Sequence, residues 1–368
     1  MLKMLGYTFK DLKQELVSRR VAAHRAYQLF NWIYRKTVFD FDEMSDLPKA
    51  WRAELKAEWK TVDLETVEVL EDPSGETVKF LFKTEDGQYI ESVLIYQEDD
   101  SDPDEGGEAK RVTLCVSSQA GCALGCAFCA TGKLGFRRDL TASEIVSQTM
   151  LAERWLVGKG GVRPDADTNG RNITSIVFMG MGEPLLNYDN VLHAVRILNF
   201  NGGFNVGARH ITISTAGITS NIKRLAEEGM QLRLALSLHA ADQNKRRNLM
   251  PIAEKWKLPE LMENVRDYQK TFGRRVTIEY VLLRGINDGE EDVLELKRLM
   301  FDLRYIVNVI LYNPVSGSPF DRPTDNDVRS FTALLKRHGI PYVFRLSKGD
   351  NIRAGCGQLG LYWDSLKK

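Results

Sequence analysis

The chain has 368 residues, more than twice the ~150 typical of one domain, so it can bury a large core and carry an accessory domain. Its composition, 43% hydrophobic and 27% charged, excludes disordered and fibrous proteins. The 50 basic and 50 acidic residues balance, which excludes a uniformly basic nucleic-acid-binding protein but not local basic patches. With no membrane-length apolar run and no signal-peptide pattern at the N-terminus, we expect a cytoplasmic protein without membrane contact.

The first 60 residues predict a small helical domain. Apolar residues recur at helical spacing in residues 9–16 and 27–33. Eight Lys and Arg residues against Asp11 and Glu15 give the first 38 residues a net charge of +6. This charge marks either the solvated face of a bundle or an RNA-binding accessory domain. Further pairs that could hold an RNA backbone are Arg19 with Arg20, Arg35 with Lys36, Arg137 with Arg138, and residues 245–247.

Residues 61–110 predict a linker. Alternating apolar residues on both sides of Asp86 and Gly87 indicate a β-hairpin. Residues 97–110 contain seven acidic residues together with proline and glycine, which predicts a surface loop. The linker separates the helical domain, residues 1–60, from a larger third part, residues 111–368.

Strands and helices alternate throughout the third part. Six strand-like segments are each followed by a helix-like segment, and a seventh strand comes last, at residues 342–346. This order predicts an α/β fold, a partial parallel (βα)6 barrel. The alternative is an open doubly wound sheet. The expected strands cover 111–116, 174–178, 210–214, 232–238, 276–282 and 307–311, and the expected helices 142–156, 188–198, 220–228, 259–271, 290–303 and 325–337.

Three cysteines follow the first expected barrel strand. Cys122, Cys126 and Cys129 have a C-x3-C-x2-C spacing that lets one loop wrap around a soft-metal centre. A structural zinc site would normally have a fourth ligand nearby. Three thiolates on a four-iron cluster instead leave one iron open. Chance and a structural zinc remain the alternatives, although active sites of barrels lie at this end of the strands.

Polar residues follow other strands at the same rim. After the second strand, Gly182 allows close approach of a ligand and Glu183 can accept a hydrogen bond from a cationic amine. Later strand ends carry Ser214, the run Ser237, Leu238 and His239, and Asn313. Each alone is typical of a turn or a helix cap.

The cysteine motif resembles the signature of the radical S-adenosylmethionine (SAM) superfamily. This resemblance implies a [4Fe–4S] cluster held by Cys122, Cys126 and Cys129. It also implies SAM on the open iron, whose reductive cleavage yields a 5′-deoxyadenosyl radical. Residues implied to contact SAM are Gly182, Glu183, Ser214, Ser237, Leu238, His239 and Asn313.

Longer stretches resemble the RlmN/Cfr family of radical SAM RNA methyltransferases. They are residues 24–34, 113–119, 121–124, 180–187, 214–217 and 354–359, so the resemblance covers nearly the whole chain. Ala216 departs from the serine common there. The family implies methylation of adenine carbon 2 in 23S rRNA at the peptidyl-transferase centre and in tRNA next to the anticodon. It further implies an electron donor such as flavodoxin, and we expect a monomer.

The same resemblance gives three residues catalytic roles. Cys356 would carry a methyl group from one SAM molecule, and a radical formed from a second would convert it into a methylene that adds to the adenine. Cys115 would release the covalent protein–RNA adduct by forming a disulfide with Cys356. Glu91 would accept the ring proton. Without the resemblance, the two cysteines would be interpreted as small buried hydrophobic residues and Glu91 as an exposed strand carboxylate.

Two other functions remain open. A Cfr-type enzyme shares every cysteine and methylates adenine carbon 8 instead, and no residue distinguishes the two by chemistry. A non-catalytic iron–sulfur RNA-binding protein would need neither Cys356 nor Glu183.

Overall fold

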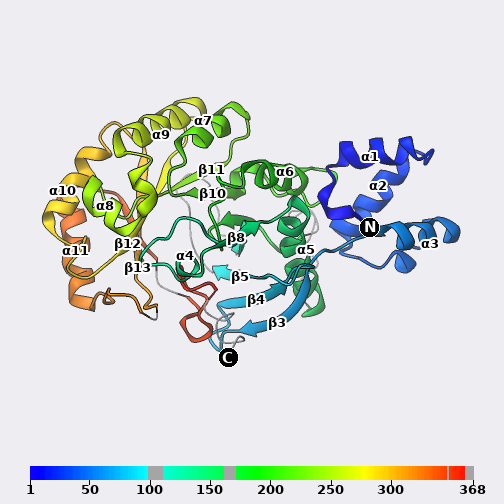
Figure 1. Cartoon of the computed structure of the whole chain (residues 1–368), viewed down its shortest axis with the longest axis horizontal. Coiled ribbons are helices and arrows are strands. Elements are labelled where there is room, and N and C mark those ends of the chain that lie inside the picture. The colour runs from blue at the N-terminus through cyan, green and yellow to red at the C-terminus, as the bar shows by residue number, and fades with distance from the viewer. Residues whose placement is uncertain (98–110, 161–170, 316, 346–347, 361–368) are drawn as a thin grey trace.

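The computed structural model describes residues 1–97, 111–160, 171–315, 317–345 and 348–360. The expected acidic loop, residues 98–110, lies outside these ranges. Helices α1 (Phe9–Ser18), α2 (His24–Phe30) and α3 (Lys49–Glu58) form a lobe at one end of the molecule (Figure 1). The helical N-terminal region predicted from apolar spacing is therefore present. None of the described helices is long and apolar enough to cross a membrane.

Aromatic packing fastens this lobe to the rest of the chain. Phe9 stacks on Phe200 with ring centroids 4.8 Å apart, and Phe30 meets the same ring edge-on. The backbone carbonyl of Gly6 accepts a hydrogen bond from His193 Nε2 at 2.9 Å. Leu5, next to Gly6, is fully buried. The buried apolar residues of the lobe and of the main domain form one continuous hydrophobic core.

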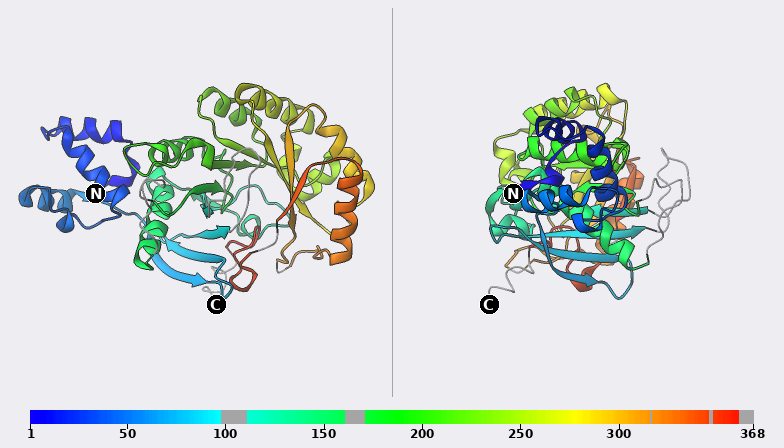
Figure 2. Two further views of the ribbon diagram at one scale, coloured as in Figure 1. Left: turned by 180° about the vertical axis from the view of Figure 1, so that it is seen from behind. Right: turned by 90° about the vertical axis from the view of Figure 1, so that its right-hand side faces the viewer.

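Seven parallel strands build the main domain, in consecutive spatial order. A doubly wound sheet requires a reversal of strand order, so that alternative is wrong. The sheet curves like part of a barrel, and the helices cover its convex face (Figures 1 and 2). The strands are β6 (Arg111–Cys115), β9 (Ser175–Phe178), β10 (Ile211–Thr215), β11 (Arg233–Ser237), β12 (Val276–Leu282), β13 (Tyr305–Leu311) and β14 (Tyr342–Arg345).

The crossover helices agree with the expected ones to within a few residues. Helix α5 begins with the predicted capping box, in which Thr141 Oγ1 accepts from the Glu144 amide and the Glu144 carboxylate accepts from the Thr141 amide. The helices are α5 (Ala142–Gly158), α6 (Tyr188–Asn199), α7 (Thr219–Glu227), α9 (Leu258–Phe272), α10 (Glu290–Leu299) and α11 (Asp325–Arg337).

The predicted hairpin extends the same sheet. Strands β4 (Thr77–Lys83) and β5 (Tyr89–Gln97) pair as expected, β3 (Glu65–Glu71) joins β4, and β5 pairs antiparallel with β6. One face of β4 packs Phe80 against Trp155 of α5, while the other face is also buried. The sheet therefore has ten strands, and no pairing in the described residues joins its edges, β14 and β3, into a closed barrel. The division at residues 60 and 110 stays a prediction.

Several short elements were not predicted. Helix α8 (Gln243–Leu249) has a charged sequence without apolar periodicity, which is why spacing alone does not indicate it. Helix α4 (Ala130–Leu134) and strands β7 (Gln119–Gly121) and β8 (Phe136–Asp139) surround the cysteine loop. The backbone carbonyl of Leu249 accepts a hydrogen bond from the Ala127 amide at 2.9 Å, so α8 lies directly against that loop.

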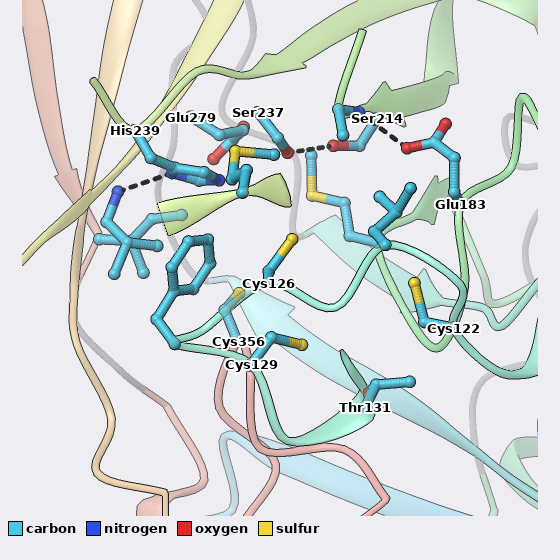
Figure 3. A pocket seen from close by; sticks show the side chains of 18 of the residues that line it. Cys122, Cys126, Cys129, Thr131, Glu183, Ser214, Ser237, His239, Glu279 and Cys356 are labelled. Atoms are coloured by element: carbon cyan, nitrogen blue, oxygen red, sulfur yellow. Dashed lines mark hydrogen bonds between the residues drawn. The ribbon is translucent and has the colours of Figure 1, made fainter. Parts of the chain in front are cut away.

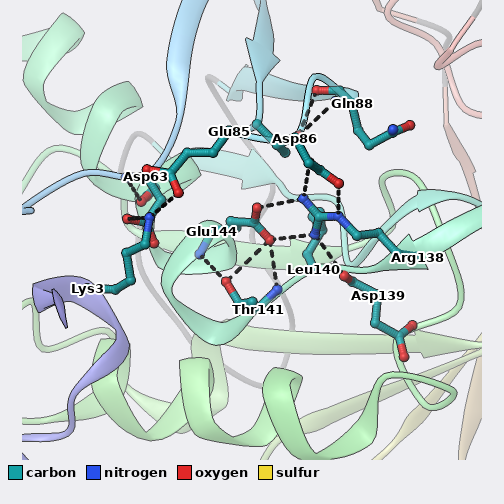
Figure 4. Close-up of polar contacts among 12 residues, drawn as sticks. Lys3, Asp63, Glu85, Asp86, Gln88, Arg138, Asp139, Leu140, Thr141 and Glu144 are labelled. Carbon is teal, nitrogen blue, oxygen red and sulfur yellow. Dashed lines mark hydrogen bonds and ion pairs between the residues drawn. The ribbon is translucent and has the colours of Figure 1, made fainter. Parts of the chain in front are cut away.

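Arg138 of β8 joins three parts of the fold (Figure 4). Its guanidinium lies 2.7 Å from Asp86, in the turn between β4 and β5, and 2.8 Å from Glu144, at the start of α5. Both carboxylates receive two N–H bonds, the bidentate geometry that makes arginine pairs strong. Its expected role in holding an RNA backbone therefore competes with these contacts.

Replacing Arg138 should destabilise the fold. Arg138→Met leaves the nearly buried Glu144 carboxylate without its cation, so the free energy of unfolding should fall by about 1–3 kcal/mol in urea titrations. Lys159→Met is the matched control, because Lys159 and Glu71 are both about half exposed; its effect should stay below about 1 kcal/mol. Equal effects of the two substitutions would contradict this role of Arg138.

Candidate active site

A deep cavity opens at the carboxyl ends of the parallel strands (Figure 3). Its volume is about 150 Å³. Ten of the residues singled out in the sequence line it: Cys122, Cys126, Cys129, Gly182, Glu183, Ser214, Ser237, His239, Asn313 and Cys356.

The three motif cysteines line one side of the cavity and are largely buried. Burial raises the pKa of Cys122 to about 12 and that of Cys126 well above its usual value. Binding to a metal centre would therefore release protons from these thiols. Among the described residues, no three His, Cys, Asp or Glu side chains converge on a single-ion position. Three thiols on one loop fit a cluster in which each binds a different iron.

Glu183 is a buried carboxylate held by backbone amides. Its Oε2 accepts from the Ala216 amide at 2.7 Å, and its Oε1 accepts from the Leu185 amide at 3.0 Å. Burial nevertheless raises the pKa of Glu183 to about 7. Gly182 beside it has φ +99°, and a Cβ there would come within 2.5 Å of Gln119 Cβ. The site therefore presents a carboxylate that a buried cationic amine would stabilise in its ionised form.

Two serines and a histidine form the opposite wall. Ser214 Oγ and Ser237 Oγ lie 3.4 Å apart. His239 Nδ1 accepts a hydrogen bond from the Val281 amide at 3.1 Å, and burial lowers the pKa of the ring to about 3. The imidazole is therefore neutral, with its proton on Nε2. The side chain of Leu238 is fully buried and is not part of the cavity wall, which leaves it only backbone groups for a ligand.

Cys356 reaches the cavity from the C-terminal segment, residues 348–360. Its carbonyl accepts from Asn313 Nδ2 at 3.2 Å. The next carbonyl, of Gly357, accepts from the Ala130 amide at 2.8 Å, and the carbonyl of Leu359 accepts from Thr131 Oγ1 at 2.7 Å. Because Ala130 directly follows Cys129, these bonds hold the segment against the cysteine loop. Cys356 itself is exposed.

Cys115 and Glu91 lie deeper, outside the cavity wall. Strand register places Lys79, Val93 and Cys115 side by side across β4, β5 and β6, with Glu91 two residues from Val93 toward the cavity. These residues share the concave face of the sheet, since side chains alternate along a strand. Lys79 Nζ lies 3.4 Å from Glu91 Oε2 and donates to the Arg353 carbonyl at 3.2 Å. Lys79 thus links Glu91 to the segment that carries Cys356.

Some site residues were missed or misplaced by sequence reasoning. Glu279 lines the cavity and accepts from Asn308 Nδ2 at 2.6 Å; a lone carboxylate in an apolar strand could have indicated it. Thr131 also went unnoticed. Arg246, expected to hold an RNA backbone, is fully buried. That expectation was wrong, because the charged sequence of α8 does not show which side chain faces inward.

Comparisons with known proteins agree with this geometry. A model of the radical SAM superfamily matches residues 116–296. The crystal structure of a radical SAM methyltransferase from Sphaerobacter thermophilus matches with a TM-score of 0.89 and 42% identity, over 98% of this chain and 99% of that one. The fold and the cysteine-lined cavity are therefore those of a radical SAM protein.

Further relatives narrow the class. A protein from Lawsonia intracellularis called a dual-specificity RNA methyltransferase RlmN is 41% identical, over 98% of this chain and 96% of that protein. A probable RlmN from Thermotoga neapolitana is 40% identical over 98% of both chains. A model of the ribosomal RNA large subunit methyltransferase N-terminal domain matches residues 2–60. The chain belongs to the RlmN family, as its motifs indicated.

The raised pKa of Glu183 predicts a pH-dependent stability of the protein without ligands. Between pH 4.5, the usual pKa, and about 7, the folded state binds a proton that the unfolded state has lost, so stability falls as pH rises. Between pH 5 and pH 8, the free energy of unfolding of the unmodified protein should fall by up to about 3 kcal/mol relative to that of Glu183→Gln. Urea titrations at both pH values measure this. A stability difference independent of pH would contradict it, and the exposed Glu71→Gln is the control.

Proposed function

We propose that the protein is a radical SAM methyltransferase of RNA that forms 2-methyladenosine through a methylated Cys356. The observation that carries the proposal is the position of Cys356 in the same cavity as Cys122, Cys126 and Cys129. Its segment is hydrogen-bonded to the cysteine loop at Ala130. A sulfur that receives and gives up a carbon group must lie beside the bound methyl donor, and this arrangement satisfies that need.

The cavity would hold the cofactors on opposite walls. A [4Fe–4S] cluster would be bound by Cys122, Cys126 and Cys129. The Glu183 carboxylate would accept a hydrogen bond from the amino group of SAM. The polar groups of Ser214, Ser237, His239 and Asn313, and the backbone at Gly182 and Leu238, would contact the rest of SAM. When bound, the cluster and SAM supply the methyl group and the 5′-deoxyadenosyl radical. The neutral His239 adds no second positive charge beside the sulfonium.

Glu91 would accept the proton that leaves the methylated ring. Its carboxylate is 1% exposed and lies beside the equally buried ammonium of Lys79. That opposite charge favours the ionised form of the carboxylate, which is the form that can accept a proton. Glu91 lies nearer the cavity than Cys115 in the strand register, so substrate in the cavity would meet Glu91 first.

Cys115 would release the RNA from the covalent adduct. Its thiolate attacks the Cys356 sulfur, an S–S bond forms, and the bond from that sulfur to the RNA methylene breaks. The electron pair of the broken bond passes to the released carbon, which takes up a proton to become the methyl group, and an external dithiol later reduces the disulfide. Both residues are thiols in the structure, the state from which such a cycle begins.

RNA would reach the cavity as an unstacked loop. A base cannot enter a barrel while stacked in a helix, so the adenosine must be turned out. The proposed substrates are 23S rRNA and tRNA, with an electron donor such as flavodoxin. Exposed basic residues of the N-terminal lobe, among them Lys10, Lys13 and Arg20, would hold the phosphates.

Two assays separate the alternatives. Position-specific labelling of adenosine distinguishes methylation at carbon 2 from the carbon 8 reaction of a Cfr-type enzyme. Release of 5′-deoxyadenosine from the reduced, reconstituted protein excludes a non-catalytic iron–sulfur RNA-binding protein.

Substitution of the two cysteines tests the proposed function directly. Cys115→Ala should accumulate protein cross-linked to RNA through Cys356, because the adduct forms but cannot be resolved. Cys356→Ala and the double variant should show no cross-link, since no methyl carrier is present. Nuclease-sensitive bands on denaturing gels report the adduct. If both cysteines only packed the core, each alanine substitution would cause a modest loss of stability and no adduct. The proposal would be wrong if Cys115→Ala were isolated free of RNA from a host in which the unsubstituted enzyme is active.

Charge removal tests the RNA-binding role of the lobe. Replacing Lys10, Lys13 and Arg20 by Gln should weaken RNA binding. The slope of the logarithm of the binding constant against the logarithm of the salt concentration should become shallower by up to ~0.7 per lost phosphate contact. SAM cleavage should continue, because the cavity lies in the main domain. The control replaces Lys270, Lys297 and Arg298, which carry the same charge on exposed parts of α9 and α10. Equal effects of both triple substitutions would assign the lobe charges to a solvated face.

A further inference from the structure

A buried arginine lies behind the cysteine loop with part of its guanidinium unsatisfied. Arg246 of α8 is 0% exposed and stands outside the cavity wall. Its Nη2 donates to the Ala216 carbonyl at 2.6 Å and to the Ser237 carbonyl at 3.5 Å. Its Nε and Nη1 have no hydrogen-bond partner among the described residues. Buried cationic donors are costly unless they are paired, so these two groups point to an acceptor that becomes available only when a ligand binds.

The surroundings of Arg246 single out one candidate partner. Arg246 Nη2 donates to the Ala216 carbonyl, and Ala216 belongs to the same buried cluster as Cys126. Burial raises the pKa of the Cys126 thiol and lowers that of His239, and the positive charge of Arg246 lowers both pKa values. The imidazole of His239 is neutral and cannot balance a positive charge, whereas a coordinated Cys126 is a thiolate. Helix α8 holds the arginine in place, because its Leu249 carbonyl bonds the Ala127 amide next to Cys126.

We propose that Arg246 is a positioning residue for the iron–sulfur cluster, donating N–H bonds to the Cys126 sulfur and placing a fixed positive charge behind it. The proposal rests on the cluster of the proposed function, but not on the RNA substrate. Hydrogen bonds to ligand sulfurs and nearby positive charge stabilise the extra electron of a reduced cluster. Arg246 therefore raises the reduction potential at which SAM cleavage can begin.

The carboxylate of SAM is a competing partner for the same donors. Arg246 is closed off from the cavity, so a ligand in the cavity would have to displace part of the wall to reach it. The Cys126 sulfur already belongs to that wall. The two partners predict different results, since a bond to Cys126 acts on the cluster before SAM is added.

The test compares three variants after anaerobic reconstitution. Arg246→Gln keeps a donor but loses the charge, Arg246→Lys keeps the charge but loses the planar fork, and Arg247→Gln is the control. Arg247 is the neighbouring residue, half exposed and 3.6 Å from Glu254. Iron content, melting temperature of the metal-free protein and the cluster midpoint potential are measured without SAM, the last by titration followed by electron paramagnetic resonance.

The expected result is a lower potential in Arg246→Gln. At the parent midpoint, its ratio of reduced to oxidised cluster should fall at least about tenfold, which is 59 mV for one electron. Arg246→Lys should fall less, and Arg247→Gln should match the parent. Loss of iron from an Arg246→Gln protein that keeps the melting temperature of the metal-free parent would also support the proposal, because coordination would then depend on the charge.

Three outcomes would overturn the role of Arg246 or the proposed function on which it rests. Arg246→Gln with four irons and the parent potential excludes the role, and a fall in SAM affinity alone would assign the arginine to the SAM carboxylate instead. If Arg246→Gln does not fold, the similarly long, uncharged Arg246→Met is judged by the same potential. Failure of the parent itself to form a four-iron cluster would remove the proposed function, which is a different result from an unchanged potential.

Discussion

The position of Cys356 depends on a few hydrogen bonds between the start of helix α4 and the C-terminal segment. Ala130 and Thr131, directly after the cysteine motif, donate to the carbonyls of Gly357 and Leu359. Within the described ranges no pairing closes the sheet between its edge strands, so residues 348–360 can lie beside β4, where Lys79 donates to the Arg353 carbonyl. A closed barrel would exclude the segment from this path. The open sheet and these bonds together put a thiol from one end of the chain beside the cysteine motif.

Buried charge is the second organising feature. Glu183, Arg246 and the Lys79–Glu91 pair are nearly or fully inaccessible, and burial of charge opposes folding unless a partner is supplied. Lys79 and Glu91 supply each other. Glu183 is held by backbone amides and the Thr215 side chain but by no cation, and Arg246 is only partly satisfied. In the proposed function, the amino group of SAM would balance the charge of Glu183, and the cluster thiolate would balance the charge of Arg246. Ligand binding would therefore also stabilise the folded protein.

The predictability of each element follows from where its signal lies. The capping box at Thr141 and the apolar strands from Arg111 onward carry local signals, and the structure has those helices and strands. Helix α8 lacks a periodic apolar face, so its existence and the inward direction of Arg246 were missed. The hairpin was predicted as a pair, but its pairing with β6 depends on residues distant in sequence, which spacing cannot indicate.

The sequence by itself determined the order of strands and helices, the three-cysteine loop and the polar residues at strand ends, because periodicity and spacing are local properties. The catalytic roles expected for Glu91, Cys115 and Cys356 came from the family resemblance. Only the tertiary structure decided that Cys356 lines the cavity and that Lys79 joins Glu91 to the segment carrying Cys356. It also decided that Arg246 is buried on a helix that bonds the cysteine loop. These facts arise from strand register and loop packing, which bring together residues hundreds of positions apart.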